Sequence, residues 1–186
     1  MIEMHLAERT SKAIEPITSQ QEEIVIEATQ AYIDKASTLL GRQFGMIPVR
    51  FDIRGRAAGM YRVRWNQREI RYNPYIFAKY FTDNLAITVP HEVAHYIVDM
   101  VYGIHRVKSH GKEWRSLMDL LGAEAKATCC YELDGIPLKS QQRFPYQCGC
   151  QTHMFTTRRH NQAQKAIVQY RCRSCGDTLT PKPEGR

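Results

Sequence analysis

Apolar side chains recur every three or four residues between Ser19 and Gly41, and this spacing predicts an amphipathic helix. The residues on its apolar face are Ile24, Val25, Ala28, Tyr32, Ala36, Leu39 and Leu40. Ser19 is followed three residues later by Glu22, which is a capping-box signature, so we expect the helix to begin at Ser19. Residues 1–18 show only weak periodicity, and we interpret them as a loosely held leader.

The pattern changes after Pro48, where apolar and charged residues alternate as they do in half-buried strands. The alternating segments are residues 49–54, 61–65 and 70–72. They predict two or three antiparallel strands with arginines on the outward face. Three of these arginines would then share one surface, namely Arg62, Arg64 and Arg71.

Residues 85–101 are apolar almost all round, which predicts a buried helix, yet they contain His91, Glu92 and His95. Helical residues four apart lie on the same face, so the two histidines can present ring nitrogens to one metal ion. The H-E-x-x-H pattern is typical of zinc peptidases, in which the histidines bind Zn²⁺ and the glutamate is the general base. The alternative is a pair of core histidines satisfied by hydrogen bonds. Without a compensating metal, however, these polar groups are costly to bury.

A catalytic zinc needs a third protein ligand and an open position for water. Two histidines follow the motif, His105 and His110. His110 precedes Gly111 and a second amphipathic helix that ends near Gly122, so it can be anchored rigidly. His105 lies in a basic polar loop, where an exposed imidazole is the simpler interpretation. We therefore favour His110 as the third ligand.

The tail contains two paired-cysteine turns with 21 residues between them, C-G-C and C-R-S-C-G. Their spacing predicts the two halves of a four-thiolate structural zinc site, formed by Cys148, Cys150, Cys172 and Cys175. Because C-x-C is a less usual half, His153 or His160 could replace one of the first pair. A redox pair at the second turn is the alternative, but the surrounding sequence lacks the βαβ pattern that this would require.

The segment VPHEVAHYIVDMVYG, followed by SHGKEW, resembles the SprT family of zinc metallopeptidase-like proteins. That family carries H-E-x-x-H on one helix, a third histidine in an H-G-x-x-aromatic segment, and a zinc ribbon after the peptidase domain. The matching positions are His91, Glu92, His95 and His110, and the resemblance covers roughly residues 20–180. It implies an α+β fold with a zincin-like core of helices on a small antiparallel sheet in residues 19–136. A basic zinc ribbon would follow in residues 137–186.

The resemblance also implies an activity. Relatives of Spartan type degrade proteins crosslinked to DNA, so we expect a zinc-dependent endopeptidase acting near DNA, with one catalytic and one structural Zn²⁺. Glu92 would be its catalytic residue. Two alternatives stay open. One is a nucleic-acid-binding regulatory protein with a vestigial peptidase site, although such a site has no need of the glutamate. The other is a general peptidase whose basic tail only tunes solubility.

The net charge of +7 lies entirely in the tail, because residues 137–186 hold nine Lys and Arg against two Asp and Glu. Arg158 and Arg159 lie between the two cysteine turns, in a predicted loop that could reach a phosphate backbone. Residues 50–71 add seven arginines against two acidic residues. Two basic patches suggest a polyanionic partner, most simply DNA. Solvated charge that only maintains solubility is the alternative.

No run of 18 apolar residues and no signal-peptide pattern occurs, so we expect a cytoplasmic monomer that acts on proteins and does not associate with membranes. In that compartment cysteines serve as metal ligands or free thiols. Cys129 and Cys130 are adjacent and cannot share one metal without strain. We expect them to be buried free thiols.

Overall fold

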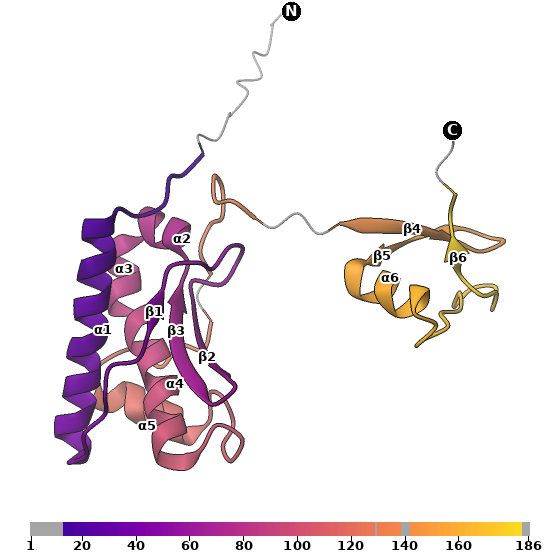
Figure 1. Cartoon of the computed structure of the whole chain (residues 1–186). Coiled ribbons are helices and arrows are strands. Elements are labelled where there is room, and N and C mark those ends of the chain that lie inside the picture. Colours follow the sequence, from indigo (N-terminus) through magenta and orange to yellow (C-terminus); the bar gives the residue numbers. More distant parts are fainter. Residues whose placement is uncertain (1–12, 129, 139–141, 184–186) are drawn as a thin grey trace, which may run out of the picture. The chain divides into compact units, whose positions relative to one another are not determined.

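The computed structural model of the protein describes residues 13–128, 130–138 and 142–183, which form two compact units separated near residue 139 (Figure 1). The elements of the first unit are α1 (Ser19–Leu40), β1 (Val49–Arg50), β2 (Gly59–Arg64), β3 (Gln67–Tyr72), α2 (Pro74–Lys79), α3 (Phe81–Ala86), α4 (Thr88–Tyr102) and α5 (Lys112–Leu120). Those of the second are β4 (Arg143–Gln147), β5 (Thr152–Thr156), α6 (Thr157–Gln164) and β6 (Thr180–Pro181). The predicted α+β fold class is confirmed.

Helix α1 forms as predicted, but its N-terminal cap lies one residue before Ser19. The hydroxyl of Thr18 accepts the backbone N–H of Gln21, and the Gln21 side chain accepts the backbone N–H of Thr18. This capping box uses glutamine in place of the expected Glu22, and it satisfies two N–H groups that lack intrahelical partners. The helix ends at Gly41, whose left-handed φ of 59° suits a residue without a Cβ.

The sheet of the first unit has the order β1-β3-β2. Strands β2 and β3 form the predicted antiparallel hairpin, joined by a tight turn in which Trp65 and Asn66 both have positive φ. Strand β1 instead pairs with β3 in parallel, with Val49 opposite Ile70, so the fully antiparallel prediction was wrong for β1. Residues 51–58 cross one end of β3, from β1 on one side to β2 on the other. Strand β2 therefore begins at the end of the sheet where β1 stops, and the two run in opposite directions. Because β2 is antiparallel to β3, β1 is parallel to β3. Strand β2 is left as an edge strand.

Helix α4 is the centre of the first unit, because it contacts α1, α3, α5 and the β2–β3 hairpin (Figure 1). Its buried apolar side chains include Val89, Val93, Ala94 and Ile97, all with no exposed surface. Burial on nearly every side explains why its sequence is apolar all round. The packing fixes this helix rigidly, which is what a site built on it needs.

Asp99, near the end of α4, connects three parts of the first unit. Its carboxylate accepts hydrogen bonds from the Tyr61 hydroxyl at 2.6 Å, from the Arg68 guanidinium at 2.7 Å and from the backbone N–H of Ile104 at 2.8 Å. Burial raises the pKa of Asp99, but the bonds from Tyr61 and Arg68 outweigh it, so the pKa lies below its ordinary value. The buried carboxylate thereby holds both hairpin strands and the loop that leads to His110.

Replacing Asp99 with Asn should lower the free energy of unfolding by about 2 kcal/mol at pH 7, because Arg68 loses its charged partner. The loss stays modest because Arg68 is partly exposed and water can solvate its charge. A folded-state pKa below the unfolded value means that the carboxylate stabilises the fold above about pH 4 and stops doing so at lower pH. The free energies of unfolding of wild type and Asp99→Asn, measured with urea at pH 7 and pH 3, should therefore differ less at pH 3. Asp119→Asn, on the exposed face of α5, is the matched control and should match wild type at both pH values.

The second unit is a small sheet of order β5-β4-β6 with α6 following β5. Its buried hydrophobic side chains, within the part described, are Tyr146, Phe155 and Cys172. So small a core indicates that the unit depends on something besides apolar burial. In neither unit does the described chain contain a helix long and apolar enough to span a membrane.

Candidate metal centre and active-site cleft

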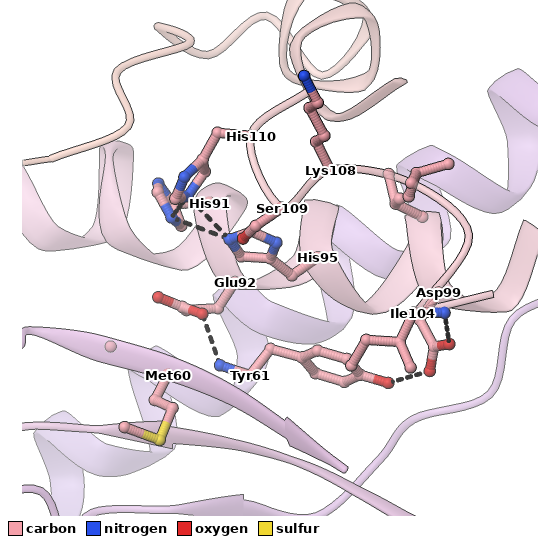
Figure 2. Close-up of a pocket in the computed structure, with 13 residues that line it drawn as sticks. Met60, Tyr61, His91, Glu92, His95, Asp99, Ile104, Lys108, Ser109 and His110 are labelled. Carbon is pink, nitrogen blue, oxygen red and sulfur yellow. Dashed lines mark hydrogen bonds between the residues drawn. The ribbon is translucent and has the colours of Figure 1, made fainter. Parts of the chain in front are cut away.

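The structure brings His91, His95 and His110 together although the third lies on a different element. His91 and His95 come from successive turns of α4, and His110 comes from the loop just before α5 (Figure 2). Their three Nε2 atoms lie 3.1–3.2 Å from one another. His105 is exposed and stands outside this group, so the structure favours His110 over His105 as the third member.

The spacing of the three nitrogens fits a zinc ion. A tetrahedral site with Zn–N bonds of about 2.0–2.1 Å separates its nitrogen ligands by roughly 3.3–3.4 Å. Three neutral rings cannot satisfy three mutual Nε2 contacts with hydrogen bonds, since each ring nitrogen either donates or accepts and at least one pair must then be two donors or two acceptors. A single cation bonded to all three nitrogens removes this conflict.

Burial keeps the three rings in the neutral form that a metal requires. It lowers the pKa of His91 to about 4 and that of His95 to about 3, and it also lowers the pKa of His110. Trp114 packs against all three rings, with its ring centroid 4.8 Å from those of His91 and His110 and 5.8 Å from that of His95. Its indole N–H donates to the His91 carbonyl at 3.3 Å. The fully buried tryptophan thus anchors α5 to α4 at the point where the ligands meet.

Glu92 is buried between α4 and strand β2, next to the histidines. Its Oε2 accepts the backbone N–H of Tyr61 at 2.6 Å (Figure 2). Burial raises the pKa of Glu92 to about 8, and the hydrogen bond from Tyr61 acts in the opposite direction. A cation among the three histidines would further favour the ionised carboxylate, which is the form that accepts a proton.

Two open cavities meet at this site. One, of about 300 Å³, extends towards Val98, Ile104 and Lys108, and the other, of about 240 Å³, extends towards Arg56 and Tyr131. Gly59, His91 and Glu92 line both cavities. The result is a cleft that crosses the candidate metal centre beside an edge strand. An extended peptide can occupy such a cleft by adding to the strand.

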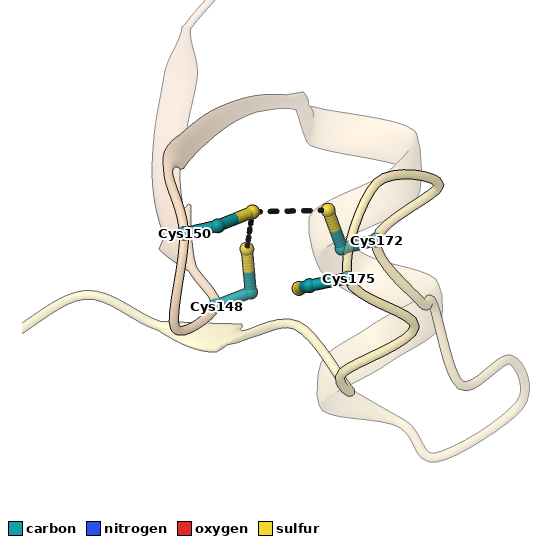
Figure 3. Close-up of side chains that lie close together, drawn as sticks. All are labelled: Cys148, Cys150, Cys172 and Cys175. Atoms are coloured by element: carbon teal, nitrogen blue, oxygen red, sulfur yellow. Dashed lines mark hydrogen bonds between the residues drawn. The ribbon is translucent and has the colours of Figure 1, made fainter.

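Cys148, Cys150, Cys172 and Cys175 form a second candidate metal centre, in the second unit (Figure 3). All four sulfur atoms lie within 4.8 Å of one another, and the Cys148–Cys150 and Cys150–Cys172 sulfur distances are 3.4 and 3.7 Å. A tetrahedral Zn–S₄ site, with bonds of about 2.3 Å, separates its sulfurs by roughly 3.8 Å. Backbone N–H groups of Cys175 and Ser174 lower the pKa of Cys172 to about 5, which favours the thiolate.

The two histidines considered as substitutes for a cysteine are not members of the four-cysteine group. His153 Nε2 lies 3.6 Å from the Cys148 sulfur, beside the four-cysteine cluster. His160 is stacked on Phe144 at 3.8 Å and shares a hydrogen bond with the Tyr146 hydroxyl. Of the other two cysteines, Cys130 is exposed, so the prediction of a buried thiol was wrong there. Cys129 lies outside the described residues.

The arginines predicted to contact nucleic acid differ in how free their charges are. Strand register places Arg62, Arg64 and Arg71 on one face of the hairpin, as expected. Arg62, however, pairs with Glu69 at 2.5 Å, and Arg71 pairs with Asp52 at 2.7 Å. Glu69 is shared with Arg50 at 2.9 Å, so these ion pairs reduce the positive charge of that face without removing it. Among the described residues, Arg64 is the member of the trio without an ion pair.

Arg158 and Arg159 lie in the first turn of helix α6, and not in the loop that the sequence suggested. Thr156 caps this helix by accepting the backbone N–H of Arg159. Both arginines are exposed, and no ion pair within the described part of the chain involves them. Arg159 also lines a pocket of about 650 Å³ that contains Tyr170 and two further arginines, Arg171 and Arg173. The ribbon therefore presents unpaired positive charge beside an aromatic ring.

Two further parts of the site were not identified from the sequence. Trp114 belongs to the H-G-x-x-aromatic segment and could have been proposed as a support for the ligands. Nothing in the sequence pointed to Gly59, because the feature that matters is its close contact with Thr88 and Glu92, on a helix some thirty residues later.

Comparison with known proteins agrees with this arrangement. The SprT-like family model matches residues 26–137, and the SprT-like zinc ribbon domain matches residues 142–182. The relatives named Protein SprT include one from Klebsiella pneumoniae (strain 342), which is 38% identical over 88% of this chain and 94% of its own length. Another, from Cronobacter sakazakii (strain ATCC BAA-894), is 39% identical over the same shares of the two chains. A third, from Glaesserella parasuis serovar 5 (strain SH0165), is 36% identical over 81% of this chain and 92% of the relative. The chain therefore belongs to the SprT-like family, with a SprT-like zinc ribbon at its C-terminal end.

Proposed function

We propose that this chain is a zinc-dependent endopeptidase that cleaves proteins bound or crosslinked to DNA. The observation that carries the proposal is the convergence of three histidine Nε2 atoms within 3.1–3.2 Å, beside a buried glutamate, in an open cleft. Hydrolysis of a peptide bond needs these two components, an electrophilic centre and a base, at one place. Glu92 supplies the base.

His91, His95 and His110 would hold the catalytic zinc, and the four ribbon cysteines a second, structural zinc. A zinc ion bound by three histidines acts as a Lewis acid that activates water and polarises a carbonyl group. Glu92 accepts a proton from the attacking water and then delivers it to the departing amine. The edge of β2 holds the substrate backbone in an extended conformation along the cleft. Because Asp99 already binds the Tyr61 hydroxyl, that hydroxyl is not free to stabilise the developing oxyanion.

The basic ribbon supports DNA as the second partner. Its excess charge lies in a small unit, and Arg158 and Arg159 form no ion pair within the described residues. Phosphate groups are the anions that such side chains recognise without regard to base sequence. The ribbon would hold the peptidase near proteins that are themselves on DNA.

The direct experiment is proteolysis of a DNA-bound protein by the zinc-loaded chain, with and without DNA. We expect cleavage to require zinc, to stop on chelation and to return when zinc is added back, and we expect DNA to accelerate it. Tight DNA binding without cleavage of any tested protein would instead favour the alternative of a nucleic-acid-binding regulatory protein. Cleavage with no response to DNA would favour a general peptidase.

Replacing both Arg158 and Arg159 with Ala should weaken DNA binding and make it less sensitive to salt. Each lost phosphate contact lowers the slope of log affinity against log salt concentration by about 0.9 on double-stranded DNA. Fluorescence anisotropy between 50 and 200 mM salt measures this slope. Lys165→Ala, at the other end of α6, is the control for a general change of charge. Equal slopes for wild type and the double variant would remove these arginines from the interface.

A further inference from the structure

Strand β2 approaches the candidate general base so closely that no side chain fits between them. A Cβ atom built on Gly59, the first residue of β2, would lie 2.6 Å from Oε1 and 2.7 Å from Cγ of Glu92. It would also lie 2.7 Å from the Thr88 methyl group. Ordinary van der Waals contacts of a Cβ begin near 3.4 Å. Any residue other than glycine at position 59 would therefore displace Glu92.

The same strand also binds the other carboxylate oxygen. Tyr61, two residues after Gly59, donates its backbone N–H to Glu92 Oε2 at 2.6 Å. This N–H is available because β2 is an edge strand, so alternate amides face away from β3 towards α4. One oxygen is held by an amide and the other packs over a glycine. The position of the carboxylate is thus determined by the strand as well as by the helix that carries it.

We propose that Gly59 is a positioning residue for Glu92: the lack of a side chain at this position lets the carboxylate lie against β2, within reach of water at the three-histidine centre. The proposal rests on the peptidase function proposed above. It adds that the edge strand holds the base in place before substrate binds.

The effect of a substitution at Gly59 can be separated from backbone strain. Gly59 is absent from the glycines with positive φ, so alanine can adopt its conformation without a steric penalty from its own backbone. Alanine also reduces the conformational entropy of the unfolded chain, which favours folding. The consequences of Gly59→Ala should therefore come from the contacts of the new Cβ, two of which are with Glu92 and one with the Thr88 methyl group.

We expect Gly59→Ala to retain zinc and fold while its kcat falls by about 100-fold and its KM changes little, since a base moved by about an ångström loses most of its effect. The measurements are steady-state cleavage of a protein substrate and zinc content by mass spectrometry. Gly45→Ala is the matched control, because a Cβ there meets nothing within 4 Å and the backbone is compatible. Adding Gly59→Ala to Glu92→Gln should cause no further loss, because the glycine acts through the glutamate.

A second measurement does not depend on activity. In the zinc-loaded protein the Tyr61 amide should resonate downfield because of its short bond to a carboxylate, and Gly59→Ala should shift it towards the position seen in Glu92→Gln. Unchanged kcat, an unchanged Tyr61 amide, or loss of zinc or fold in Gly59→Ala would each overturn the proposal. If wild type cleaves nothing, the peptidase function fails, and the Tyr61 amide alone then decides whether Gly59 positions Glu92.

Discussion

Substituting Gln for Glu92 should reduce the proposed proteolysis by about 10²–10⁴-fold while both candidate metal centres keep their zinc. A glutamine has nearly the same size, but it cannot accept the proton of the attacking water at neutral pH. It can still accept the Tyr61 N–H through its amide oxygen, so the cleft should keep its shape. The loss should appear in kcat, because the base acts on the reacting water and not on substrate binding.

The control for this substitution is Glu113→Gln. Glu113 lies in the first turn of α5, three residues after His110, and it lines a different groove. The same chemical change is therefore made close to the centre but outside the cleft, and activity should stay within about twofold of wild type. Measuring zinc content and cleavage on all three proteins separates loss of the base from loss of the metal. Full activity in Glu92→Gln would refute the assigned role of the glutamate.

Replacing Cys172 with Ser should unfold the ribbon and leave the first unit folded. Complete burial of Tyr146 and Phe155 contributes only about 2–3 kcal/mol each, which is little for a unit that has few other buried side chains. Zinc held by four thiolates has an apparent binding free energy of about 10–16 kcal/mol in small zinc domains, and this energy stabilises the fold. Losing one thiolate removes much of it, since the remaining three cannot complete the site.

Two-dimensional amide spectra distinguish the units directly. In Cys172→Ser, and in wild type treated with a strong chelator, ribbon resonances should collapse to the narrow range of an unfolded chain, while the resonances of α1 and α4 keep their dispersion. Cys130→Ser is the control, because Cys130 is exposed and lies outside the four-cysteine cluster. A ribbon that stays folded without metal would contradict the inference that zinc supplies most of its stability.

Local patterns predicted much of the candidate site. The helical period aligns His91 with His95, and the thiol pairs at either end of the tail have the spacing of zinc ligands. His110 was harder, but the choice over His105 followed from the glycine and the amphipathic helix after it. The structure brings the members of each group together, and each group could be inferred because its signals lie in short segments of the chain. The α+β class and the β2–β3 hairpin follow from the same short-range periodicity.

Where the expectations were wrong, a contact between distant residues decided the outcome. Alternating residues indicate a strand but not its neighbour, so the parallel pairing of β1 could not be foreseen. Charge counts indicated a basic hairpin face but not which charges are paired, since Glu69 pairs with Arg50 and Arg62 and Asp52 pairs with Arg71. The arginines of α6 were assigned to a loop because their helix has no apolar face to reveal it.

The sequence by itself determined which side chains are candidates for the proposed chemistry, because ligand type and spacing along a helix or a turn are properties of short segments. The tertiary structure alone decided how those side chains are held. Trp114 lies beneath the three rings, and Gly59 and Tyr61 hold Glu92, only because α5 and β2 both pack on α4. Except for Trp114 with His110, such contacts join residues nineteen or more positions apart, and they form only when the hydrophobic effect brings whole elements together.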